Sequence, residues 1–174
     1  FAIPVSKVTG INVGILVLVS GLLMTATAFF GMKSLTILSM IAVPSIAILG
    51  SISAGKAIGD VGGITGLLSI EPTGTMTMSA ALASVVGTFI SGGTLTADFT
   101  RFSKDKKTAV STTVIAFLIG NSLMLAFGAI GAMATGQSDI AEVMFMQSLI
   151  IPAIIILGLN IWTTNDNALY GSGL

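Results

Sequence analysis

Long apolar runs separated by short polar segments extend along nearly the whole chain. Five of these runs reach the length of about 20 residues that a helix needs to cross a bilayer, and they lie at 12–32, 35–57, 76–100, 108–134 and 143–163. Residues 1–6 resemble the end of a sixth run. The segments between the runs are short, so we expect no soluble domain. The pattern therefore predicts an all-α integral membrane protein, with residues 1–174 in one transmembrane bundle.

Composition supports a bilayer environment and limits the chemistry of the chain. Hydrophobic residues make up 53% and charged residues only 8%, whereas a soluble domain carries about 25% charged residues. Seven basic and seven acidic residues balance, which gives no surface for a nucleic acid. The absence of Cys and His excludes disulfides, thiol nucleophiles and imidazole acid–base chemistry. We therefore expect no enzyme, no catalytic residue and no obligate protein partner, with the lipid bilayer as the surroundings.

The charges in the connecting segments predict an orientation. The segment RFSKDKK at 101–107 contains four basic residues, more than any other connection. Because cytoplasmic loops are enriched in Lys and Arg, we expect this segment in the cytoplasm. Alternation then places the acidic loops 59–75 and 135–142 on the periplasmic or extracellular side.

A polar cluster follows the last apolar run, in the stretch NIWTTNDNALY at 160–170. Four of its residues share the spacing i, i+3, i+4 and i+7, which places them on one helix face: Asn160, Thr163, Thr164 and Asn167. Hydroxyl and carbonyl oxygens are hard neutral ligands that suit a small cation such as Na⁺. The alternative is hydrogen bonding between helices, worth about 0.6 kcal/mol per contact in membranes. Four aligned polar residues beside Asp166 favour a polar cavity or an ion path.

The stretch VVGTFISGGTLTADFTRF at 85–102 is the second unusual segment. Gly92 and Gly93 each weaken a helix by about 1 kcal/mol, so the pair indicates either close packing or a broken helix at a ligand site. An aromatic ring beside small hydroxyls suits a flat polar heterocycle, which stacks on the ring and hydrogen-bonds at its edges. Thr88, Phe89 and Ser91 provide that combination. Packing through small residues, with Phe89 facing lipid, is the alternative.

Three stretches carry a resemblance to a known family: GTFISGGTLTADFTRF, GNSLM and LGLNIWTTNDNALY. They resemble the bacterial nucleobase:cation symporter family, and the likeness runs along essentially the whole chain in the same order. It implies a leucine-transporter-type fold with inverted repeats and twelve helices. This chain would be an internal fragment, from the end of helix 3 to helix 8, of a permease in the bacterial inner membrane.

The resemblance also implies a site for the base. Phe89 would stack on one face of a nucleobase, with Thr88 and Ser91 at its edge. Asn160 would hydrogen-bond the same substrate. Thr88 stands where the family leads us to expect Ser, a change that keeps the hydroxyl and adds a methyl group.

A sodium site is implied in the same way. Thr163 and Thr164 would give side-chain oxygens to Na⁺, and Asn160 would lend its main-chain carbonyl. The remaining Na⁺ ligands and the opposing stacking aromatic would come from helices 1 and 3, outside this segment.

The expected function is cation-coupled symport of a nucleobase, with cytosine as the favoured substrate and Na⁺ as the favoured coupling ion, by alternating access. A permease of the same fold for another base, or for a substrate like hydantoin or allantoin, is one alternative. Proton coupling is another, and it would need a protonation cycle at Asp98 or Asp166. A channel or a non-transporting membrane scaffold is the remote alternative.

Overall fold

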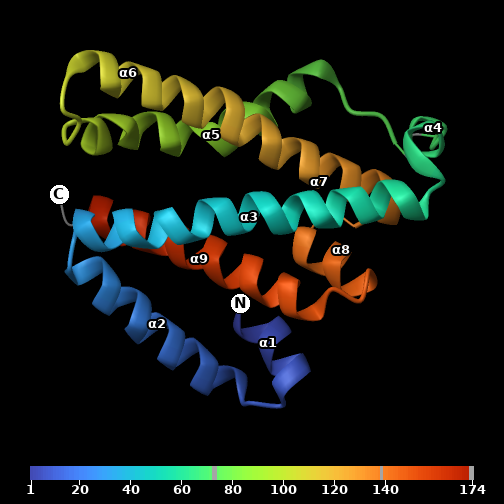
Figure 1. Cartoon of the computed structure of the whole chain (residues 1–174), viewed down its shortest axis with the longest axis horizontal. Helices are drawn as coiled ribbons and strands as arrows, with labels where there is room; N and C mark the ends of the chain where they lie inside the picture. The colour runs from blue at the N-terminus through green and yellow to red at the C-terminus, as the bar shows by residue number, and fades with distance from the viewer. Residues whose placement is uncertain (72–73, 138, 173–174) are drawn as a thin grey trace. The chain divides into compact units, whose positions relative to one another are not determined.

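The computed structural model describes residues 1–71, 74–137 and 139–172, and every regular element among them is helical. In chain order the helices are α1 (Ala2–Thr9), α2 (Val13–Phe29), α3 (Met32–Asp60), α4 (Gly63–Leu68), α5 (Met78–Thr100), α6 (Lys106–Ile115), the π-helical segment η1 (Ala116–Gly120), α7 (Asn121–Thr135), α8 (Ile140–Met146) and α9 (Ile150–Ser172) (Figure 1). The prediction of an all-α protein is confirmed.

The sequence pattern predicted one bundle, and the structure divides the chain into two compact units. Phe1–Leu68 with Ala126–Leu174 forms the first unit, and Ser69–Leu125 forms the second. The long helix that runs from α6 through η1 into α7 contributes to both.

Side-chain caps and a glycine turn explain where several helices begin. Asn12 accepts a hydrogen bond from the Gly14 N–H at 2.8 Å, and Asp139 accepts one from the Ala141 N–H at 2.8 Å. Such caps satisfy backbone donors that have no partner within the helix. Gly31, at φ 67°, makes the sharp turn between α2 and α3 in a conformation that residues with a Cβ rarely adopt.

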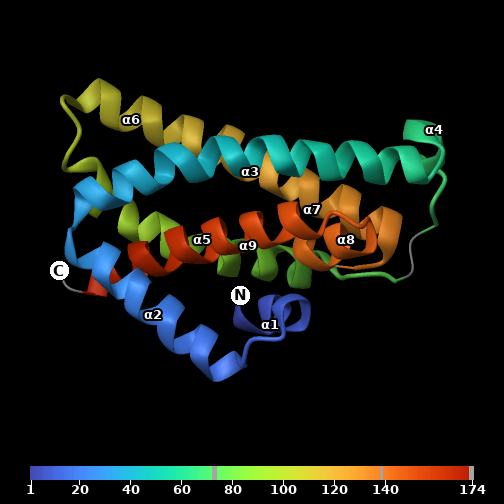
Figure 2. The ribbon, with the colours of Figure 1, turned by 60° about the horizontal axis from the view of Figure 1, so that its bottom comes forward.

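Helix α9 is the central element of the first unit. It packs against α2, α3 and α8, and Figures 1 and 2 show it beside α3 with α2 crossing near its C-terminal end. The buried core consists of Met144, Ala153 and Ile156. Four partly buried residues pack around it: Leu49, Ile140, Phe145 and Leu149. The helix that carries the predicted cation ligands is therefore held on several sides within this unit.

Two glycines allow close helix contacts in the first unit. A Cβ added to Gly50 on α3 would lie 2.5 Å from the ring of Phe127 on α7. A Cβ on Gly131 would lie 3.2 Å from the Val143 side chain of α8. Small residues at such positions let membrane helices approach each other closely.

The structure differs from the prediction at 143–163. Helix α8 ends at Met146, and α9 begins only at Ile150 and continues to Ser172. Ser148 between them has φ 60°, which a continuous helix does not allow. At this break the Gln147 side chain is buried and hydrogen-bonded to Ser53 on α3.

In the second unit, α5 runs unbroken from Met78 to Thr100 through both Gly92 and Gly93. A Cβ on Gly92 would lie 3.4 Å from the Phe117 ring, in ordinary contact. A Cβ on Gly93 would have no atom within 4 Å. The structure therefore shows a continuous helix at the glycine pair and not a broken one. Phe117 lies within the π-helical segment η1.

Long apolar helices with exposed side chains agree with a membrane environment. Among the described residues, three helices are long and apolar enough to cross a bilayer: Met32–Asp60, Met78–Thr100 and Lys106–Thr135. Val43 on α3 is 65% exposed and Leu118 on η1 is 68% exposed. Apolar side chains left uncovered over whole helices are typical of a surface that faces lipid or further helices.

Candidate cation and substrate site

Helix α9 presents buried residues on one face and exposed residues on another. Ala153 and Ile156 are buried at 0% and 2% exposure in the core. Asn160 and Thr164 are exposed, and Thr163 is half-buried. The predicted cation ligands therefore line an open side of the helix, where another segment or an ion can reach them.

Both threonine hydroxyls of this site are oriented by their own helix. Thr164 Oγ1 donates to the Asn160 carbonyl at 2.7 Å, and Thr163 Oγ1 donates to the carbonyls of Leu159 at 2.9 Å and Asn160 at 3.0 Å. A hydroxyl has one proton and two lone pairs. Because the proton points back into the helix, each oxygen keeps acceptor capacity for a cation.

The same hydrogen bonds bear on the predicted role of Asn160. Its main-chain carbonyl accepts from both threonine hydroxyls in this structure. The role of that carbonyl as a cation ligand stays a prediction. The side-chain amide of Asn160, which is exposed, offers both donors and an acceptor to a substrate.

A polar contact ties this part of α9 to α2. The indole Nε1 of Trp162 donates to Thr27 Oγ1 at 2.9 Å, and Thr27 Oγ1 donates to the Met24 carbonyl at 2.8 Å. Asn165 Nδ2 points at the sulfur of Met24 at 3.3 Å. Trp162 lies between Asn160 and Thr163 in sequence, so this contact limits rotation of the helix segment that carries the cation ligands.

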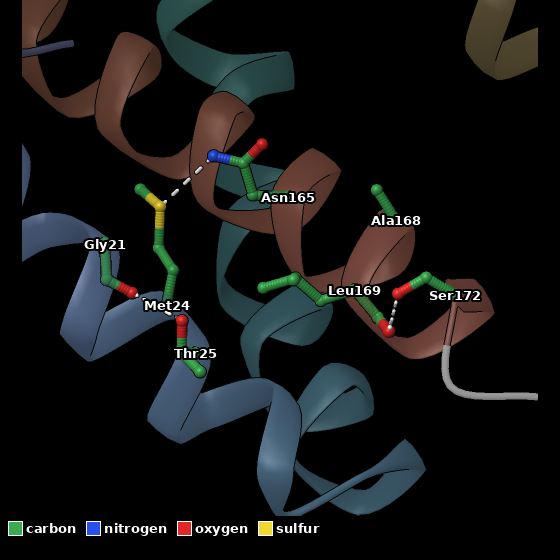
Figure 3. A pocket seen from close by; sticks show the side chains of 7 residues that line it. All are labelled: Gly21, Met24, Thr25, Asn165, Ala168, Leu169 and Ser172. Carbon is green, nitrogen blue, oxygen red and sulfur yellow. Dashed lines mark hydrogen bonds between the residues drawn. The ribbon is translucent and has the colours of Figure 1, made fainter.

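Beside this contact, α2 and α9 enclose an open groove of about 400 Å³ (Figure 3). Its lining is largely small or apolar: Gly21, Met24, Thr25, Asn165, Ala168, Leu169 and Ser172. The hydroxyls of Thr25 and Ser172 donate to carbonyls of their own helices at 2.8 Å, as Figure 3 shows. Few polar groups are left for a ligand, so the groove does not resemble a site for a polar heterocycle.

A second polar network, which sequence reasoning missed, fixes the start of α9. Ser53 Oγ donates to Gln147 Oε1 at 2.8 Å, and Gln147 Nε2 donates to the Ser53 carbonyl at 3.0 Å. Both side chains are buried, at 1% and 4% exposure. Lys56 Nζ donates to the Gln147 carbonyl at 2.7 Å, at the C-terminal end of α8. The one signal in the sequence was a lysine at the edge of an apolar run.

The predicted base-binding residues lie on α5 in the second unit. The backbone of Thr88, Phe89 and Ser91 is helical, and their side chains lie outside the part of the chain that the structure describes. Their stacking and hydrogen-bonding roles stay predictions. The roles of Asn160, Thr163 and Thr164 stay predictions too.

The predicted cation ligands on α9 are neutral oxygen donors. Within residues 1–71, 74–137 and 139–172, no group of three His, Cys, Asp or Glu side chains could hold a metal ion. Neutral hydroxyl and amide oxygens are the ligands on offer. Such a set suits a hard ion of low charge.

Comparison with known proteins agrees with the sequence motifs. Residues 2–174 match the model of a family described as permease for cytosine/purines, uracil, thiamine, allantoin. Curated relatives include the cytosine permeases of Escherichia coli O157:H7 and Escherichia coli (strain K12), each 57% identical over all 174 residues. The chain spans 42% of the length of these relatives.

The apolar helices and the family match define the class as a multi-pass membrane protein of a permease family. The chain belongs to the family of permeases for cytosine/purines, uracil, thiamine and allantoin. The resemblance drawn from GTLTAD and LNIWTTNDNALY is thereby confirmed.

Proposed function

We propose that the full-length protein imports cytosine across the bacterial inner membrane together with Na⁺. Membership of the permease family supports a nucleobase as the substrate, and the relatives of 57% identity are cytosine permeases. The arrangement on α9 is the observation that supports the coupling ion. Two adjacent threonine oxygens lie on an accessible part of the helix with their protons turned inward.

In this mechanism, Thr163 and Thr164 bind the cation, and Thr88, Phe89, Ser91 and Asn160 bind the base. Asn160 connects the two sites, because its amide meets the substrate and its carbonyl orients both threonine hydroxyls. Coupling requires that Na⁺ and cytosine each favour one conformation over the other, since equal affinities for both would shift no population. The basic segment 101–107 faces the cytoplasm, and loops 59–75 and 135–142 face outward.

Uptake of radiolabelled cytosine by the full-length protein, with and without an imposed Na⁺ gradient, tests the proposal. Thr163→Ala and Thr164→Ala should each raise the Na⁺ concentration needed for half-maximal uptake. Thr112→Ala is the matched control, because Thr112 is also exposed and also donates to its own helix, at the Thr108 carbonyl. Unchanged Na⁺ dependence in both site variants would rule out the cation assignment.

The base site needs its own variant. Phe89→Ala should weaken cytosine binding at saturating Na⁺ by roughly 1–3 kcal/mol, the usual worth of stacking a base on an aromatic ring. Phe29→Ala removes a ring that is 87% exposed at the end of α2, and it should leave affinity unchanged. Equal cytosine affinity in the Phe89 variant and the wild type would refute the stacking role.

The family description also favours testing other substrates. The family includes permeases for uracil, thiamine and allantoin beside those for cytosine and purines. Each compound, together with a hydantoin, should therefore be offered as a competitor of labelled cytosine. If one of them competes more strongly than unlabelled cytosine, that compound is the preferred substrate. If a pH gradient drives uptake without Na⁺, the coupling ion is H⁺.

A further inference from the structure

Asp166 is the most unusual buried residue of the chain. Its side chain is 0% exposed, and in the described part of the structure neither carboxylate oxygen has a hydrogen-bond partner. It is the only charged residue of α9. Helix α2, which packs against this end of α9, contains no charged residue at all.

The neighbouring donors are already engaged elsewhere. Thr27 lies beside Asp166, but its single hydroxyl proton goes to the Met24 carbonyl at 2.8 Å, and the Trp162 indole N–H goes to Thr27 at 2.9 Å. Asn165 directs its amide at the Met24 sulfur. Thr27 is thus a neutral polar neighbour of Asp166, and with its proton on the Met24 carbonyl it brings no charge to the carboxylate.

The cationic side chains of the first unit do not supply a counter-charge either. Lys56 donates to the Gln147 carbonyl at 2.7 Å, at the other end of α9. Lys7 and Lys33 are both exposed. A buried carboxylate without a partner is strongly unfavourable unless a positive charge comes close to it. Within the described residues of the first unit, the Asp166 carboxylate therefore has no counter-charge.

We propose that Asp166 is the fixed counter-charge for the cation bound at Thr163 and Thr164. This inference rests on the proposed function and adds a residue to its cation site. Thr163 and Asp166 are three residues apart on a helix, which places their Cβ atoms about 5–6 Å from each other. Hydroxyl and carbonyl ligands are neutral, so the bound ion keeps its full charge. Asp166 offsets that charge through space without coordinating the ion.

Cation binding by the full-length protein tests this role. Equilibrium binding of labelled cytosine is measured against Na⁺ at constant ionic strength, with choline as the replacement cation. Asp166→Asn keeps the shape of the side chain and removes its charge. We expect the half-saturating Na⁺ concentration to rise roughly tenfold. This is the order of magnitude of the attraction between two opposite charges several ångströms apart inside a protein. Cytosine affinity at saturating Na⁺ should stay unchanged.

Three further variants complete the experiment. Asp166→Glu retains the charge and should restore Na⁺ affinity to within a few-fold of the wild type. Asp166→Ser is a second neutral variant, expected to show the same shift, and it serves if Asp166→Asn does not fold. Asp60→Asn removes the same charge from an exposed position in the same unit, and it should change nothing.

The outcomes separate this inference from the function on which it rests. Unchanged Na⁺ affinity in the neutral Asp166 variants overturns the counter-charge role. If the Thr163 and Thr164 variants still weaken Na⁺ binding in that case, the cation site itself stands. If those threonine variants bind Na⁺ like the wild type, the proposed cation site fails. A loss of cytosine affinity at saturating Na⁺ in Asp166→Asn would also refute the role, because it would place Asp166 in the base site.

Discussion

The indole Nε1 of Trp162 donates a hydrogen bond to the hydroxyl of Thr27 at 2.9 Å. This bond joins α9 to α2 through two residues that are 135 positions apart in sequence. This contact lies one turn before the buried Asp166 and within the run that holds Asn160, Thr163 and Thr164. It is part of a short chain of donors, since Thr27 in turn donates to the Met24 carbonyl. The orientation of the candidate cation site therefore depends on α2 as well as on α9.

Thr27→Val should destabilise the purified full-length protein, because it leaves the indole N–H of Trp162 without its acceptor. We expect the free energy of unfolding to fall by about 0.6–1.7 kcal/mol. These values are the average and the maximum for hydrogen bonds between membrane helices. Thermal unfolding in detergent measures it. Thr25→Val is the control, since the Thr25 hydroxyl bonds only to the Gly21 carbonyl of its own helix. If Thr27→Val lowers the stability by the same amount in the Trp162→Phe background as in the wild type, the contact contributes nothing.

Gln147→Leu should be more damaging, because it breaks both buried hydrogen bonds to Ser53 between α8 and α3. Leaving buried polar groups unpaired costs about 1–3 kcal/mol each, so we expect a clear drop in unfolding temperature. Ser51→Ala is the comparison, since its hydroxyl bonds to the Ala47 carbonyl within α3 at 2.7 Å. Equal melting temperatures for the two variants would mean that the Ser53–Gln147 pair does not hold α8 in place.

The pattern of apolar residues was sufficient to predict helices near 12–32, 35–57, 76–100 and 108–134, because each run is long and has polar residues at both ends. It could not predict the break at Gln147, since a single Gln in an apolar run resembles any tolerated polar residue. What ends α8 is a partner on α3, 94 residues away in sequence.

Only the local part of the candidate site could be predicted from the sequence. Helical spacing grouped Asn160, Thr163 and Thr164, and that argument needs only one helix. The burial of Asp166 depends on α2, which packs against α9 from far away in the sequence. Its lack of a hydrogen-bond partner among the described residues depends on how α2 and α9 pack. Neither fact is local, so no spacing rule could reveal it.

Gly50→Ala should destabilise the first unit, because the new methyl group would lie 2.5 Å from the ring of Phe127. Overpacking of this kind costs about 1–3 kcal/mol. Gly55→Ala is the matched control on the same helix, with no atom within 4 Å of the added Cβ. It should be neutral or stabilising by up to about 1 kcal/mol, the helix propensity difference between Ala and Gly. The full-length variants are compared by thermal unfolding, and an equally stable Gly50→Ala would show that α3 and α7 can separate at this point.

Asp105 should make the start of α6 sensitive to acid. Its carboxylate accepts the Thr108 backbone N–H at 2.7 Å, and this hydrogen bond holds the pKa of Asp105 below its ordinary value of 3.8. A group whose pKa is lowered by folding stabilises the folded state above its unfolded pKa, and the contribution is lost as the pH falls through the folded pKa. We therefore expect hydrogen-exchange protection of the Thr108 amide, corrected for intrinsic exchange rates, to be constant near neutral pH and to decrease below pH 3.8. Asp105→Asn keeps a capping oxygen without a titrating proton, so its protection should not change over that range. A decrease of the same size in both proteins would show that the cap does not cause the pH dependence.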